Sequence, residues 1–440
     1  MTANPKQLLS VPDGIFLVAG MVIGVGIFKL PSLVAGNTTS ETQFLMAWLL
    51  GGAISLCGAL VYAELASRYP ETGGEYRFLQ QGLGRGAAFV FAWARLTVIQ
   101  TGAIVAVGFA FGDYASEVLR LGEKSSAWWA AIAVIALTAL NVAGTMQSKT
   151  LQKVTEIVLI AALVLIALGA LVVGGTPKPM AADAKTGPFG LAMIFVLFAY
   201  GGWNEAAYLS GEVRDARRNM LRILVAGIVV VTVLYVLVNV AYLMTLGQGG
   251  MRESKAIAVD LMRVIAGDKA AVLIALVVCV SALTTMNAAV FTGARATWAF
   301  GRDYPLFARL GSWRESGSTP ANALLLQGAV MLLLVLAASF TRDGFQAMVD
   351  YTAPVFWTFF LLTGLTLFVF RRRGGEAPAV RTPGYPVIPA VFCLMCLYML
   401  YSTIDYARAP WGPKFGGMVL VGILVVAAGI PLCFLARRKQ

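Results

Sequence analysis

The sequence predicts an all-α membrane protein that crosses the bilayer twelve times, and composition, hydropathy and loop charge all favour this class. Of its 440 residues, 59% are hydrophobic and 13% are charged, and the mean hydropathy is +0.78. A soluble chain carries roughly 25% charged residues, so we expect most of this protein's surface to face hydrocarbon. No polar stretch is long enough to form a soluble domain, and residues 1–440 are therefore assigned to a single membrane domain.

Apolar runs define the predicted spans. Each reaches the ~20 residues that a helix needs to cross the bilayer. The first run is too long for the apolar core of a cleavable signal peptide, so we expect it to be the first membrane helix. The twelve spans are expected at about 12–36, 43–67, 86–118, 127–145, 151–174, 189–210, 220–246, 269–300, 319–340, 346–370, 384–404 and 415–436.

Loop charges predict the orientation. Connections alternate between the two sides, and one side carries about twice as many Lys and Arg residues, which marks it as cytoplasmic. That side holds Lys6, Arg68, Arg77, Arg85, Lys149, Lys153, Arg214, Arg217, Arg218, Arg302, Arg309, Arg314, Arg371, Arg372, Arg373, Arg381, Arg437, Arg438 and Lys439. The other side holds Arg120, Lys124, Lys178, Lys185, Arg252, Lys255, Arg263, Arg342, Arg408 and Lys414. Both termini are then cytoplasmic in a multi-pass protein of the cell (plasma or inner) membrane, which agrees with an even number of spans.

Other features of the composition narrow the class of function. The formal net charge of +12 would favour nucleic-acid binding in a soluble protein, but here cytoplasmic loops account for it. The absence of His removes the commonest transition-metal ligand. The five cysteines lie in apolar runs, where we expect small buried side chains: Cys57, Cys279, Cys393, Cys396 and Cys433.

Two spans carry glycine and polar residues near mid-membrane depth. The first contains Gly24-Val25-Gly26-Ile27-Phe28 followed by Pro31, and the sixth contains the run from Phe198 to Glu205. This placement, five spans apart, is typical of inverted-repeat transporters, in which the first helix of each repeat is interrupted. We expect repeat one at about 12–174 and repeat two at about 189–370. The alternative is that the glycines only permit close helix packing.

Interrupted helices offer groups that bind a zwitterion. The broken ends present free N–H groups and a positive dipole to an anion, and free C=O groups to a cation. An amino acid carries both charges on adjacent atoms, so one pair of interruptions can hold its shared backbone.

At these residues the chain resembles the amino acid–polyamine–organocation superfamily of transporters, and within it the L-type-like amino acid permeases. The most specific string is Phe198-Ala199-Tyr200-Gly201-Gly202-Trp203-Asn204 in the sixth span. Further similar strings occur at residues 24–28, 69–76, 291–303 and 319–323, and the resemblance extends over all twelve spans.

The resemblance implies a LeuT-like fold, namely a five-plus-five inverted repeat followed by two accessory helices at about 384–436. It also implies alternating access to a central amino acid site without a cofactor. Amides around Val25 and Gly26 would hold the substrate carboxylate. Its ammonium group would be held by the carbonyls of Val22 and Ile23, together with Phe198, Ala199 and Gly201. The candidate substrate-binding residues are Val22, Ile23, Gly24, Val25, Gly26, Ile27, Phe198, Ala199, Tyr200, Gly201, Gly202, Trp203, Asn204 and Asn287.

Two positions depart from the family pattern. Many relatives carry a lysine in the fifth helix that can stand in for sodium, and the matching residue here is Leu159. Others carry a carboxylate in the sixth helix where this chain has Asn204, followed by Glu205. Neighbouring residues of a regular helix point about 100° apart, so the sequence leaves open whether Glu205 faces the substrate.

Ionisable residues inside spans are candidates for coupling or gating, because burying them in the membrane is costly. Lys29 follows the first interruption and either neutralises a carboxylate or extends to the surface. Glu205 is a candidate for proton coupling or for a permanent ion pair, with Arg95 as a possible partner. Glu64, near Arg68, is expected in an inner gate or a structural network.

The leading prediction is a secondary active transporter of amino acids, and neutral L-amino acids are favoured because the pocket candidates are mostly apolar or small. A same-fold transporter of amines, polyamines or cationic amino acids is the alternative if a carboxylate faces the ligand. A channel lacks support because no filter-like repeat is present, and an enzyme because no metal cluster or nucleophile motif is present. Expected partners are the substrate, lipid and a coupling ion (H+ or Na+), without nucleic acid; exchange and uniport also remain open.

Overall fold

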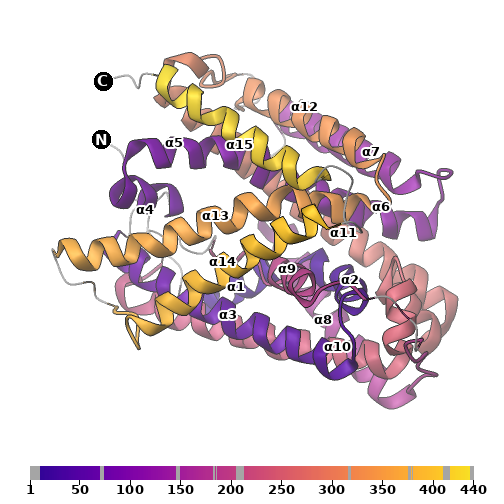
Figure 1. Cartoon of the computed structure of the whole chain (residues 1–440). Coiled ribbons are helices and arrows are strands. Elements are labelled where there is room, and N and C mark those ends of the chain that lie inside the picture. The colour runs from indigo at the N-terminus through magenta and orange to yellow at the C-terminus, as the bar shows by residue number, and fades with distance from the viewer. Residues whose placement is uncertain are drawn as a thin grey trace. The chain divides into compact units, whose positions relative to one another are not determined.

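The computed structural model describes residues 10–69, 74–144, 149–181, 184, 186–204, 213–315, 319–374, 378, 380–409 and 417–436. Figure 1 shows that helices dominate these ranges. An isolated antiparallel bridge joins Arg314 and Thr319. Ten of the described helices are long and apolar enough to cross a membrane, as a polytopic membrane protein requires.

The long helices coincide with ten of the predicted spans. One of them is a combined helix, Arg85–Val118, formed by α5 (Arg85–Ala94), η2 (Arg95–Ile99) and α6 (Gln100–Val118). The first and sixth predicted spans instead contain the shorter apolar helices α1 (Val11–Val22) and α9 (Phe189–Ala199). The other long helices are α3 (Glu41–Arg68), α7 (Ser125–Ala143), α8 (Lys149–Val173), α10 (Ala216–Glu253), α11 (Ile257–Asp303), α12 (Ala321–Ala338), α13 (Gly344–Arg373), α14 (Val387–Arg408) and α15 (Gly417–Leu435).

Local sequence signals explain where several helices begin and end. Ser10 caps α1 in a capping box with Asp13, and Ser40 caps α3. Gly247 and Gly267 have φ values of 68° and 78°, which break the helical conformation within α10 and α11. Gly247 directly follows the end of the predicted span 220–246, and Gly267 lies just before the start of the predicted span 269–300.

Two elements were not predicted from the sequence. A helix, α4 (Gly74–Leu83), occupies the connection after α3 and buries Glu75, Phe78 and Leu79. A π-helical turn, η2, interrupts the third predicted span and begins at Arg95. A π-helical turn inside a span does not alter the apolar pattern of the sequence, so hydropathy does not predict where such a turn occurs.

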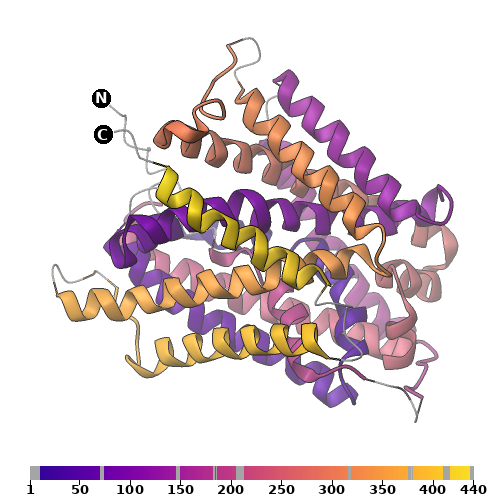
Figure 2. The same cartoon turned by 45° about the horizontal axis from the view of Figure 1, so that its top comes forward.

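The chain divides into two compact units, each assembled from three separate stretches. The first unit comprises residues 1–88, 176–252 and 357–402, and the second comprises residues 89–175, 253–356 and 403–440. Within the first unit, Figure 2 shows the C-terminal half of α13 beside α14, where Phe360 and Phe392 pack with ring centroids 6.1 Å apart. Within the second unit, α6 packs against α7 and α11. Tyr351 of α13 donates to the carbonyl of Thr97 at 2.9 Å.

The cysteines behave as small side chains of the helical interior. Cys279, Cys393 and Cys396 are buried, while Cys57 and Cys433 are partly buried. All five thiols are free.

Candidate functional site

The first interruption separates the two halves of the first predicted span. α1 ends at Val22, and Ile23 and Gly24 leave the helical conformation, with ψ values of 89° and −160°. A 3-10 turn, η1 (Val25–Phe28), follows, and α2 (Leu30–Gly36) resumes the helix. Peptide groups at this point therefore fall outside a continuous α-helical ladder.

The second interruption follows α9. The helix ends at Ala199, and the chain turns through Tyr200 and Gly201 to Gly202, whose φ is +108°. This conformation is strained for residues with a Cβ atom, so glycine ends the helix here. Trp203 and Asn204 complete the described part of this interruption, and Glu205 lies outside the described residues.

The two interruptions lie against each other. A Cβ atom added to Gly202 would collide with the carbonyl oxygen of Met21 at the end of α1. A Cβ atom added to Gly26 would lie 3.5 Å from the Cα atom of Ala199. Figure 1 shows α2 and α9 side by side, and the two helices pack directly. Glycines therefore allow the broken ends of two spans, far apart in sequence, to approach within contact distance.

Tyr235 of α10 joins the carbonyl ends of both broken helices. Its hydroxyl oxygen lies 2.8 Å from the carbonyl oxygen of Val22 and 3.2 Å from that of Ala199. A hydroxyl has one hydrogen to donate, so the two carbonyls share it. Sequence reasoning missed Tyr235, because a tyrosine within an apolar helix carries no local signal that distinguishes it from an ordinary core residue.

An aromatic cluster fixes the position of Tyr235. Its ring packs against Trp48 of α3 and against Tyr200, with centroid separations of 5.7 and 5.2 Å. The Tyr200 hydroxyl donates to the carbonyl oxygen of Trp48 at 3.0 Å. All three side chains are buried, so the shared hydroxyl is held by packing from three helices.

Asn204 contacts a buried carboxylate that the sequence did not single out. Its side-chain amide lies 3.3 Å from an oxygen of Glu75 on α4, and the hydroxyl of Tyr62 donates to the same oxygen at 2.6 Å. Glu75 is only 3% exposed. The signal that could have found it is its position in the similar string at residues 69–76, but only the folding of α4 brings it to Asn204.

Trp203 packs toward one end of α3. Its ring lies 5.0 Å from that of Tyr62 and 5.7 Å from that of Phe360 in α13. A Cβ atom added to Gly58 would overlap it. This is the half of α3 that contains Glu64, which the charge pattern assigns to the cytoplasmic side.

Comparison with known proteins identifies the family. The sequence profile described as amino acid permease matches residues 9–430. The chain belongs to the amino acid permease family. This membership agrees with the resemblance drawn from the sixth-span string, and it makes the protein a membrane transporter rather than an enzyme.

Several curated relatives of this permease match along most of their length. The b(0,+)-type amino acid transporter 1 of Mus musculus is 28% identical over 420 residues, which cover 92% of this chain and 84% of the relative. The serine/threonine exchanger SteT of Bacillus subtilis (strain 168) is 27% identical, with 99% of this chain and 98% of the relative covered. The large neutral amino acids transporter small subunit 2 of Rattus norvegicus is 26% identical, with 98% and 80% covered.

The remaining charged and polar candidates of the permease are distributed over both units. Lys29 follows η1 and is 3% exposed, so its side chain does not extend to the surface. In the second unit, Arg95 begins the π-helical turn, and Asn287 accepts a hydrogen bond from Asn141 at 2.7 Å. A pair between Arg95 and Glu205 stays a prediction, because Glu205 lies outside the described residues.

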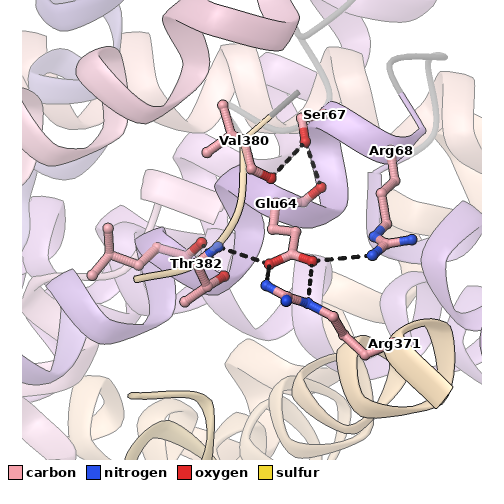
Figure 3. A network of polar contacts seen from close by, with 7 residues as sticks. Glu64, Ser67, Arg68, Arg371, Val380 and Thr382 are labelled. Atoms are coloured by element: carbon pink, nitrogen blue, oxygen red, sulfur yellow. Dashed lines mark hydrogen bonds and ion pairs between the residues drawn. The ribbon is translucent and has the colours of Figure 1, made fainter. Parts of the chain in front are cut away.

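Glu64 is the centre of a buried ion cluster in the first unit (Figure 3). Arg371 of α13 binds both carboxylate oxygens, at 2.8 and 2.6 Å. The backbone N–H of Thr382 donates to one oxygen at 2.8 Å, and Arg68 contacts the other at 3.3 Å. Ser67 extends the cluster to the carbonyl of Val380. The carboxylate is thus fully occupied by donors and ties α3 to the end of α13 and to the connection before α14.

We expect Glu64→Gln and Arg371→Gln to destabilise the permease by about 3 kcal/mol each, because removing one partner strands the other charge in a buried site. Arg68→Gln should cost far less, since its single contact is longer. Thermal unfolding in detergent measures the three variants against the wild type. Equal losses for Arg68→Gln and Arg371→Gln would contradict the assignment of the bidentate pair as the main contact.

Gly202→Ala should lower amino acid uptake by about tenfold or more. The left-handed conformation costs an alanine ~1–2 kcal/mol, and the new methyl group would push α1 away from the second interruption. Gly36→Ala is the matched control, because a Cβ atom there meets nothing within 4 Å and its φ is negative. Uptake by reconstituted protein provides the measurement, and similar rates for the two variants would show that the close approach at Gly202 is dispensable.

Proposed function

We propose that this permease moves amino acids across the membrane by alternating access, with the substrate backbone held between the two interruptions. The observation that carries the proposal is the meeting of both broken helices at Gly202 and Gly26. Backbone groups that leave a helix at membrane depth are tolerated where they line a cavity or bind a ligand. The secondary-transporter architecture places substrate sites at this kind of helix break.

The two charges of the substrate backbone would bind to opposite kinds of helix end. Amides around Val25 and Gly26, at the start of the second half of the span, suit the carboxylate. The carbonyl oxygens of Val22 and Ala199 suit the ammonium group, and with the Tyr235 oxygen they offer three acceptors for its three N–H donors. The Tyr235 hydroxyl has one hydrogen for the two carbonyls, so each carbonyl oxygen can still accept a hydrogen bond from the ammonium group of the substrate.

We propose neutral L-amino acids as the substrates. Ile27, Phe198 and Trp203 supply apolar surface near the interruptions, and the printed names of two relatives refer to serine/threonine and to large neutral amino acids. A second candidate is a cationic amino acid or an amine. The observation favouring it is Glu75, whose carboxylate lies 3.3 Å from the Asn204 side chain.

We propose obligatory exchange rather than ion-driven symport. One relative is named an exchanger, and the position where many relatives carry the lysine that can replace sodium is the buried Leu159. Coupling to H+ or Na+, with Glu205, Lys29, Arg95 or Glu64 as participants, is the alternative. The complete occupation of the Glu64 carboxylate by donors argues against a proton-carrying role for that residue.

The proposed architecture is a five-plus-five inverted repeat in one transport domain, LeuT-like, with repeats at about 12–174 and 189–370 and accessory helices at about 384–436. Both termini would face the cytoplasm in the plasma or inner membrane. Support comes from the interrupted first and sixth spans and from the loop charges, which assign Arg371, Arg372 and Arg373 at the end of α13 to the cytoplasmic side.

Uptake of labelled amino acids into proteoliposomes tests this function. We expect a neutral L-amino acid to enter faster when unlabelled substrate is inside, with no dependence on sodium or on a pH gradient. Gly26→Leu should reduce uptake by about tenfold or more, because a larger side chain would overlap Ala199. Full uptake by Gly26→Leu would refute the site, and uptake of only lysine, arginine or amines would favour the second candidate.

Tyr235→Phe should raise the KM for amino acids by about tenfold, because a hydrogen bond to a charged group contributes ~1.5–3 kcal/mol. A merely structural tyrosine would affect all substrates alike. We therefore expect the variant to lose the wild type's preference for primary over N,N-dimethylated ammonium groups. Competition of both ligand types against labelled substrate measures this, and an unchanged preference would count against the ammonium site.

A further inference from the structure

Glu75 presents one carboxylate oxygen to two donors from different parts of the first unit. The hydroxyl of Tyr62 in α3 donates to Oε1 at 2.6 Å, and the side-chain amide of Asn204, after α9, lies 3.3 Å from the same atom. All three residues are buried, and Asn204 is only 4% exposed. A carboxylate oxygen accepts hydrogen bonds through two lone pairs, so Oε1 requires a donor from each of these two neighbours.

This contact decides how the Asn204 amide is oriented. The amide has an NH2 group, which donates, and a carbonyl oxygen, Oδ1, which accepts. Turning the oxygen toward Glu75 would bring two acceptors together in a buried place, at a cost in free energy. The NH2 group is therefore fixed on the side of α4, and Oδ1 is fixed at the other end of the amide. Oδ1 accepts no hydrogen bond from the residues that the structure describes, so it can still accept one from a ligand.

Packing around Tyr62 holds this arrangement in place. The ring of Tyr62 lies 6.2 Å from that of Phe78, which follows Glu75 by almost one turn of α4. The same ring lies 5.0 Å from that of Trp203, which directly precedes Asn204. Both sides of the hydrogen bond are thus anchored on one buried tyrosine. A packed supporting layer of this kind keeps a binding group in a single orientation.

Asn204 belongs to the second interruption, where we place the substrate. It follows Gly202, whose backbone meets the carbonyl of Met21 at the end of α1. Glu75 lies on the other side of the Asn204 amide, and its Oε1 already accepts from two donors. Asn204 is therefore the group that would touch the substrate side chain, and Glu75 acts through it as a positioning residue.

We propose that Glu75 selects the substrate side chain by fixing the Asn204 amide with its oxygen toward the substrate, so that the permease prefers hydroxyl-bearing neutral amino acids, such as serine and threonine, over apolar ones of the same shape. The inference rests on the proposed substrate site and narrows the substrate class. Valine matches threonine in shape but carries a methyl group in place of the hydroxyl. Bound valine would leave Oδ1 without a donor in a site closed to water, which is the kind of loss that discriminates most strongly between isosteric ligands.

Competition between threonine and valine measures this preference. Proteoliposomes take up the labelled amino acid that the wild type transports fastest, and unlabelled threonine or valine is the competitor. The ratio of the two inhibition constants reports on side-chain recognition separately from the transport rate. We expect the wild type to bind threonine about tenfold more tightly than valine. Glu75→Gln should bring the ratio close to one, because a glutamine side chain both donates and accepts and no longer dictates which end of the Asn204 amide faces it.

Tyr62→Phe is the matched control. It removes the other hydrogen bond to the same oxygen of Glu75 and leaves the contact with Asn204 in place. Each variant thus loses one hydrogen bond of the same buried group, and a merely structural role of Glu75 would give the two variants similar ratios. We expect Tyr62→Phe to keep the wild-type preference for threonine, whatever its rate of uptake.

Exchanging the two chemical groups provides a rescue. Asn204→Asp alone places two carboxylates against each other, so we expect it to lose uptake. Adding Glu75→Gln restores a donor–acceptor contact, now with the donor on α4, and again leaves an acceptor toward the substrate. The double variant should regain uptake and prefer threonine by about fivefold or more. Together with the wild-type ratio, it tests the proposal where Glu75→Gln alone is inactive.

The outcomes separate the selection of the side chain from transport itself. A wild type that takes up amino acids but binds threonine and valine equally would overturn the selection and leave the proposed function standing. An unchanged preference in Glu75→Gln, or equal ratios for Glu75→Gln and Tyr62→Phe, would also overturn it. Selective loss of lysine and arginine uptake in Glu75→Gln would show direct contact of Glu75 with the substrate and would refute the positioning role. A wild type that takes up no amino acid would instead remove the proposed function.

Discussion

The structure depends on one constraint: in hydrocarbon, every backbone N–H and C=O that leaves a helix must find another partner. Two spans of this permease are nonetheless interrupted. They persist because each compensates for the other: Gly202 turns the chain against the end of α1, Gly26 lets α9 approach η1, and Tyr235 serves both exposed carbonyls with a single hydroxyl. The aromatic packing of Trp48 and Tyr200 holds that hydroxyl in place.

A shared hydroxyl satisfies the two carbonyls only partly, because it has one hydrogen for two acceptors. In the site that we propose, an ammonium group would bring more donors than the tyrosine can supply and would complete the coordination of these carbonyls. Membership of the amino acid permease family supports the proposal that an amino acid binds at this place.

Polar groups elsewhere in the first unit divide into two kinds. Glu64 is enclosed by two arginines and a backbone amide, and Glu75 binds both the helix before it and the turn after α9. Along α10, by contrast, buried hydroxyl and amide oxygens have no partner.

The sequence by itself determined the class, the approximate limits of the ten long apolar helices among the described residues, and the places at which two further predicted spans leave the helical conformation. These properties follow from local causes: apolar runs of sufficient length, and glycines such as Gly202, Gly247 and Gly267 that adopt conformations other residues avoid. Tertiary structure alone decided that Tyr235 meets Val22 and Ala199, that Glu75 meets Asn204, and that Arg371 rather than Arg68 is the main partner of Glu64. Each of the first two meetings joins residues more than 30 positions apart, and the third more than 300. Such contacts are decided by the rotation of one helix about its axis relative to another. Hydropathy does not predict this rotation, because the hydropathy value of an aromatic or charged side chain is the same whichever neighbour it faces.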